Sequence, residues 1–75
     1  MNYFKIVAWI AGRQKPLYGV REYETDNWIE AYRIARNSLL KFYSDKDIIK
    51  LEVARLPAWH PEVDYYLKNK AAKNK

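Results

Sequence analysis

The stretch Thr25–Tyr43, TDNWIEAYRIARNSLLKFY, decides how the rest of this 75-residue chain is organised. At about 100° per residue its apolar side chains fall on one stripe of a helix, and polar ones such as Glu30, Arg33 and Lys41 take the opposite side. We therefore predict an amphipathic helix over residues 25–43, whose small alanines let it lie close to the layer beneath. The stripe consists of Trp28, Ala31, Tyr32, Ala35, Leu39, Phe42 and Tyr43.

Residues at both ends of this stretch are typical of helix termini. Thr25, Asp26 and Asn27 are all good N-cap residues, and Glu30 follows Asn27 at the spacing of a capping box. At the other end, Ser44 and Asp45 are polar residues that we expect to end the helix.

The segment before the helix alternates as a β-strand does. Residues 2–10 are apolar on one side throughout, which predicts a strand that buries this side beneath the helix. Residues 11–16 (AGRQKP) contain a glycine and a proline and predict a hairpin loop. The inward side of the strand consists of Phe4, Ile6, Ala8 and Ile10.

Two further strands complete the predicted sheet. Residues 17–24 form the second, and their pattern favours Tyr18 and Val20 as the inward residues, with Arg21 and Tyr23 on the other side. Glu22 and Glu24 suit an edge strand, because charge discourages pairing with another chain. Residues 47–56 form the third strand, and its inward side consists of Ile49, Leu51 and Val53.

The order strand, strand, helix, strand predicts a small α+β domain. A right-handed crossover through the helix leaves the second and third strands parallel to each other. The simplest sheet then has the order 2-1-3, with the long first strand in the middle and the helix packed on one face. A Pro-rich segment follows, in which Pro61 can start a short helix through Leu67. We assign residues 1–67 to one domain and residues 68–75 to a basic, flexible tail that folding does not need.

The positive charge of the chain is concentrated near its end. The net charge is +5, but four lysines lie within residues 68–75, and residues 1–67 hold ten Lys and Arg against nine Asp and Glu. A nucleic-acid-binding domain usually carries its basic excess on the folded body, so this distribution favours a protein partner. The chain has no cysteine and no apolar run long enough to span a membrane, so we expect a cytoplasmic location.

No pattern of residues indicates catalysis or metal binding. His60 is the only histidine and stands between two prolines, and Gly12 and Gly19 are isolated, so there is no phosphate-binding loop. Asp45 and Asp47 flank a predicted turn, where acidic residues are common. We expect neither an enzyme nor a cofactor, and no small-molecule substrate.

The sheet face away from the helix is the first candidate binding site. Aromatic rings interleaved with basic residues on an open sheet can stack on bases and hold phosphates, and the same residue types are enriched at protein interfaces. The alternative is that the C-terminal segment covers this face with Trp59, Val63, Tyr66 and Leu67. The candidate residues are Tyr3, Lys5, Val7, Trp9, Arg21, Tyr23 and Lys50.

A second candidate patch lies on the flank of the predicted helix. Ile29, Arg33, Arg36 and Leu40 fall on one line beside the core stripe. Two aliphatic side chains beside two arginines can bind a partner. The alternative is that these residues simply widen the core face of the helix.

These patterns predict a domain that acts by binding. The first hypothesis is a small protein-interaction module, which includes self-association as a homodimer, that uses the aromatic sheet face or the helix flank. The alternative is a single-stranded nucleic-acid-binding protein that uses the same sheet face, with the lysine-rich tail adding unspecific attraction.

Overall fold

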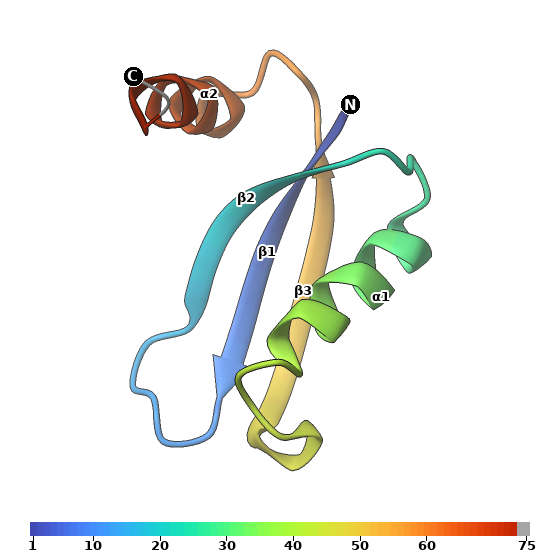
Figure 1. Ribbon diagram of the computed structural model, residues 1–75, viewed down its shortest axis with the longest axis vertical. Helices are drawn as coiled ribbons and strands as arrows, with labels where there is room; N and C mark the ends of the chain where they lie inside the picture. Colours follow the sequence, from blue (N-terminus) through green and yellow to red (C-terminus); the bar gives the residue numbers. More distant parts are fainter. Residues whose placement is uncertain (74–75) are drawn as a thin grey trace.

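The computed structural model describes residues 1–73 and shows a three-stranded sheet with one helix packed on each face. In Figure 1 the first helix lies alongside the strands and the second lies across one end of them. Neither helix is long and apolar enough within these residues to cross a membrane. The elements in chain order are β1 (Asn2–Ile10), β2 (Leu17–Tyr23), α1 (Trp28–Leu39), a 3-10 turn (Asp45–Asp47), β3 (Ile48–Leu56) and α2 (Pro61–Lys73).

The sheet has the predicted order β2-β1-β3, and β1 pairs antiparallel with both neighbours. The prediction of a small α+β domain with β1 in the centre is therefore confirmed. β1 is apolar on both sides because both of its faces are partly covered: Phe4 and Ala8 are buried on the α1 face, and Val7 is buried on the opposite face. We call these the α1 face and the second face.

Asn27, one of the three predicted N-cap residues, is the N-cap of α1. Its Oδ1 accepts hydrogen bonds from the backbone N–H of Ile29 at 2.8 Å and of Glu30 at 3.4 Å. The capping box is not completed, because the Asn27 N–H donates to the Thr25 hydroxyl oxygen, and the Thr25 hydroxyl in turn lies 3.4 Å from the Glu30 carboxylate.

The helix is shorter than predicted and its stripe is buried only in the middle. Ala31 and Ala35 are buried, in keeping with the predicted close approach of α1 to the sheet. Trp28 is 58% exposed and Phe42 is 81% exposed, so their prediction as core residues is wrong. Trp28 is the first residue of the helix, whereas Phe42 follows its last residue, Leu39, in tighter turns that no longer follow the helical stripe.

The predicted inward side of β2 is wrong. Tyr18 lies opposite Val7 and Val20 lies opposite Lys5, which places both on the second face. Val20 is buried there against α2, so its burial comes from the second helix and not from α1. The alternate residues of β2, which include Arg21, lie on the α1 face.

β3 departs from the prediction at one position. A register irregularity at Trp9 and Ile10 places Ile48 opposite Ile10. Ile48 therefore packs against the core, and Ile49, predicted to point inward, is 70% exposed. Leu51 is buried as predicted.

The C-terminal segment forms α2, which covers one end of the second face. His60 Nδ1 accepts the Glu62 N–H at 3.1 Å at the start of the helix. Val63 is fully buried with Val20 and Leu56, and Tyr66 packs against the same cluster. The alternative, in which the C-terminal segment covers the second face, thus holds in part, since Trp59 remains 78% exposed. Residues 68–73, predicted as part of a flexible tail, continue α2, and 74–75 lie outside the described residues.

Candidate functional site

The structure divides the predicted sheet-face site between two faces. The second face carries Tyr3, Lys5, Val7 and Trp9 of β1 together with Lys50, which lies opposite Trp9 on β3. Arg21 lies opposite Phe4 and Tyr23 lies opposite Asn2, so both belong to the α1 face instead. The expected platform of seven neighbouring residues is therefore not formed.

α2 removes more of that platform. The Tyr3 ring meets the Tyr66 ring of α2 edge-on, with 6.5 Å between centroids. Val7 is also buried, but it does not belong to the cluster that packs against α2. Lys5 is half-buried. Trp9 is half-buried as well, and its ring lies 4.9 Å from Nζ of the exposed Lys50, a cation–π contact that already uses this lysine.

The helix-flank patch is exposed and does not widen the core. Ile29 is 57% exposed, and Leu40 and Arg33 are also exposed. Arg36 is half-buried and forms an ion pair with Asp45, so this arginine is engaged within the chain.

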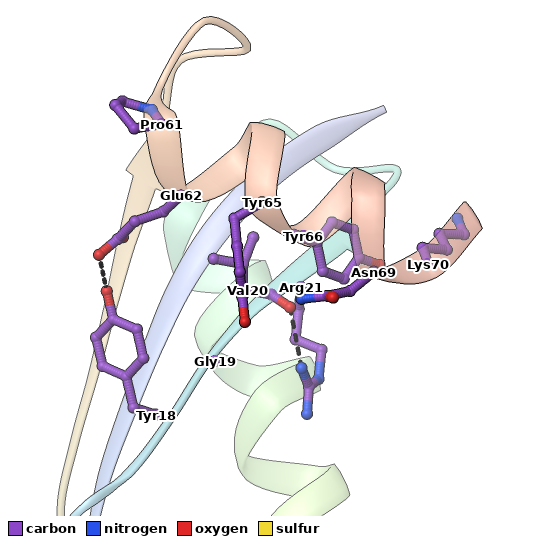
Figure 2. A pocket seen from close by; sticks show the side chains of 10 residues that line it. All are labelled: Tyr18, Gly19, Val20, Arg21, Pro61, Glu62, Tyr65, Tyr66, Asn69 and Lys70. Carbon is purple, nitrogen blue, oxygen red and sulfur yellow. Dashed lines mark hydrogen bonds between the residues drawn. The ribbon is translucent and has the colours of Figure 1, made fainter. Parts of the chain in front are cut away.

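A different site emerges along β2, the edge strand. A groove of about 680 Å³ lies between β2 and α2, and Figure 2 shows the side chains that line it. We call it the α2 groove. One wall consists of residues 18–21, and the other consists of Pro61, Glu62, Tyr65, Tyr66, Asn69 and Lys70.

Polar contacts hold both ends of α2 to β2. The Tyr18 hydroxyl donates a hydrogen bond to the Glu62 carboxylate, and Lys70 Nζ donates to Glu22 Oε1 at 2.7 Å (Figure 2 draws the first of these). The hydrogen bond to Glu62 raises the pKa of Tyr18, with smaller contributions from desolvation and from the Glu62 charge. The hydrogen bond to Glu22 and its charge raise the pKa of Lys70.

A second groove, of about 540 Å³, runs along the other face of β2. It exists because α1 packs chiefly against β3 and leaves the α1 face of β2 largely uncovered (Figure 1). We call it the α1 groove. Its floor includes Ile6 and Ala8 of β1, and its helix side is formed by Ala35, Ser38, Leu39, Phe42 and Tyr43.

Tyr23 lies along the β2 side of the α1 groove. Its ring packs on Phe4 with 5.7 Å between centroids. Burial raises the pKa of Tyr23, and the positive charge of Arg21 opposes that rise.

Tyr18, Gly19 and Arg21 belong to both grooves. The Arg21 side chain folds back over Gly19, and its Nη1 donates to the Val20 carbonyl at 2.9 Å (Figure 2). A Cβ at Gly19 would lie 3.0 Å from that Nη1, so the absence of a side chain leaves the guanidinium its place. Within residues 1–73 Arg21 forms no ion pair with a carboxylate.

Sequence reasoning missed this site because it depends on where α2 lies, which no local pattern reports. One signal was available: a glycine inside a strand often marks a place where another backbone or a ligand approaches closely. Within the described residues no cluster of three or more His, Asp or Glu side chains could hold a metal ion. No protein-family model, curated protein or solved structure matches this chain.

Proposed function

We propose that this chain is a non-catalytic protein-binding module whose partner docks along the β2 edge. The observation that carries the proposal is the meeting of two grooves at Tyr18, Gly19 and Arg21, on a strand that within residues 1–73 is paired along one side only. Binding sites are typically concave and largely apolar with a few polar groups, and both grooves have this character. Aromatic residues and arginine, the types most often found at binding hot spots, line them.

The charges around the site favour protein over nucleic acid. Glu62 and Lys70 are bonded to Tyr18 and Glu22 across the α2 groove, and Lys68 is paired with Asp64 at 3.1 Å. A nucleic-acid surface needs several cations available to phosphates, together with rings on which bases stack. Here the predicted platform is split between faces, and within residues 1–73 the one cation–π contact among its residues is that of Lys50 with Trp9.

A displayed library of random protein fragments, selected against the full chain, tests the proposal. Gly19→Val is the discriminating variant, because a Cβ at this position meets only the flexible end of Arg21 and valine favours the strand conformation. Trp28→Ala is the matched control, since Trp28 is a large exposed residue on the first turn of α1 that lines neither groove.

We expect the selected fragments to bind wild type and Trp28→Ala equally well and not to bind Gly19→Val. Fragments that still bind Gly19→Val would place the interface elsewhere and overturn the proposal. A titration with mixed-sequence single-stranded oligonucleotides serves as the second arm. Tight binding that weakens steeply with salt and survives Gly19→Val would support the nucleic-acid alternative.

A further inference from the structure

We infer that the partner is an extended peptide segment that adds to β2 as a fourth strand and carries a carboxylate for Arg21. This inference rests on the proposed function and specifies the chemistry of its ligand. It joins three observations: the unpaired backbone of β2, the two grooves beside that backbone, and the position of the Arg21 guanidinium.

The first observation is the outer edge of β2. A strand at the edge of a sheet has alternate N–H and C=O groups without a ladder partner. Within residues 1–73, β1 is the only strand paired with β2, and Arg21 is the only side chain that donates to a carbonyl of residues 17–23. The edge is thus a template for main-chain hydrogen bonds with another strand.

The second observation explains why the added strand would be a specific peptide. Successive side chains of a strand point to opposite faces of the sheet. A strand beside β2 would therefore direct alternate side chains into the α2 groove, against Tyr65 and Tyr66, and into the α1 groove, against Leu39 and Phe42. Apolar side chains in both sets would match these walls.

The third observation is the cation between the grooves. The Arg21 guanidinium donates to the Val20 carbonyl in the free chain, which occupies the edge and discourages unspecific pairing. A carboxylate is a stronger acceptor for a guanidinium than a backbone carbonyl, and it can accept two parallel N–H bonds. A partner with an acidic residue beside Arg21 would draw the guanidinium away and open the edge.

A second copy of this chain fits the site less well than a separate acidic peptide. The neighbouring carboxylate of β2, that of Glu22, is already bonded to Lys70 and is not available to another copy's Arg21.

Selection from a displayed library of random heptapeptides tests the inference on the full chain. We expect a consensus with alternating apolar residues and one Asp or Glu at a fixed position. The consensus peptide is then synthesised with its acidic residue and with the corresponding amide, and each is titrated into wild type and Arg21→Gln. The amide should weaken binding to wild type about tenfold or more and should change binding to Arg21→Gln little, because the two groups act as a pair.

Amide hydrogen exchange gives the readout for strand addition. The acidic peptide should slow exchange at alternate residues of β2, whereas a ligand that only fills the grooves would not produce that alternation. A consensus without an acidic residue, an equal loss in wild type and Arg21→Gln, or the absence of any enriched peptide would overturn the inference. A homodimer in sedimentation that Gly19→Val dissociates would overturn it too, while supporting the proposed protein-binding edge.

Discussion

Lys70 Nζ lies 2.7 Å from Glu22 Oε1, so a residue expected in a flexible tail is bonded to the edge strand β2. The Glu22 side chain is only 14% exposed, and Lys70 supplies the counter-charge that a partly buried carboxylate needs. With Tyr18 bonded to Glu62 at the other end, α2 spans the α2 groove between two polar anchors. The shape of that groove therefore depends on residues close to the C-terminal end of the chain.

The role of Lys70 is tested by shortening the chain. Deleting residues 69–75 removes this lysine and the last turns of α2, so we expect a lower urea midpoint. Lys70→Gln should lower the midpoint in the same direction, because Glu22 loses its ionic partner. Lys68→Gln is the control, since Lys68 pairs with Asp64 on the exposed side of the same helix. Equal midpoints for Lys70→Gln and Lys68→Gln would show that the Glu22 contact contributes nothing special.

Alkaline pH should destabilise the fold. In the folded protein the pKa values of Tyr18 and Tyr23 are raised from 10.0, and that of Lys70 is raised from 10.5. At a pH between the ordinary pKa and the raised pKa of each group, the native state therefore holds more protons than the unfolded state. Stability is then full below about pH 10 and is lost as the pH rises. Urea unfolding at pH 8 and at pH 11 checks the sign.

Tyr18→Phe provides the control for that experiment. It removes the ionisable hydroxyl and its hydrogen bond to Glu62, so the variant should lose less stability between the two pH values than wild type does. A midpoint that rises with pH in wild type, or an unchanged slope in Tyr18→Phe, would contradict the assignment.

His60 should act as the N-cap of α2. Its Nδ1 accepts the Glu62 N–H at 3.1 Å, the bond that a capping side chain supplies. His60→Ala should cost about 1 kcal/mol in the free energy of unfolding, and His60→Asn should recover most of that loss because asparagine is a good N-cap. Chemical denaturation measures both. If asparagine is no better than alanine at this position, the stabilising contact is not the cap.

The periodicity of apolar residues predicted the parts of the fold in which one side of a strand or helix is apolar throughout. Phe4, Ala8 and Ile10 identified the α1 face of β1, and Ala31 and Ala35 identified the contact side of α1. These segments have a single pattern, and the strand order followed from the order of the elements.

The same reasoning failed on β2 because each of its sides mixes apolar and charged residues, as with Val20 and Glu22 on one side. Val20 is buried by α2 and Tyr23 packs on Phe4 on the opposite face, so alternation could not decide which parity was inward. The prediction that Ile49 points inward failed because a register irregularity between paired strands cannot be seen in the sequence alone. The grooves were not predicted for a third reason. They are spaces left by two helices, and their existence depends on how far each helix extends over β2.

The two buried alanines of α1 allow a last prediction, which compares the core with the α1 groove. Ala31 is fully buried and does not line the groove, so Ala31→Leu should overpack the core and cost about 1–3 kcal/mol in the free energy of unfolding. Ala35 is 3% exposed but lines the α1 groove, so the larger side chain of Ala35→Leu can extend into that space and should cost less.

The two variants should also separate in binding. Because it fills the α1 groove, Ala35→Leu should weaken the binding of the fragments selected at the β2 edge. Ala31→Leu should leave their affinity unchanged under conditions in which the variant is folded. Arg33→Leu, on the exposed side of α1, is the reference and should change stability by less than about 0.5 kcal/mol. Urea midpoints and fragment titrations on the same preparations decide the matter. If Ala35→Leu is as costly as Ala31→Leu and leaves binding intact, the α1 groove is too shallow to accept a side chain, and a strand added to β2 would have support on one face only.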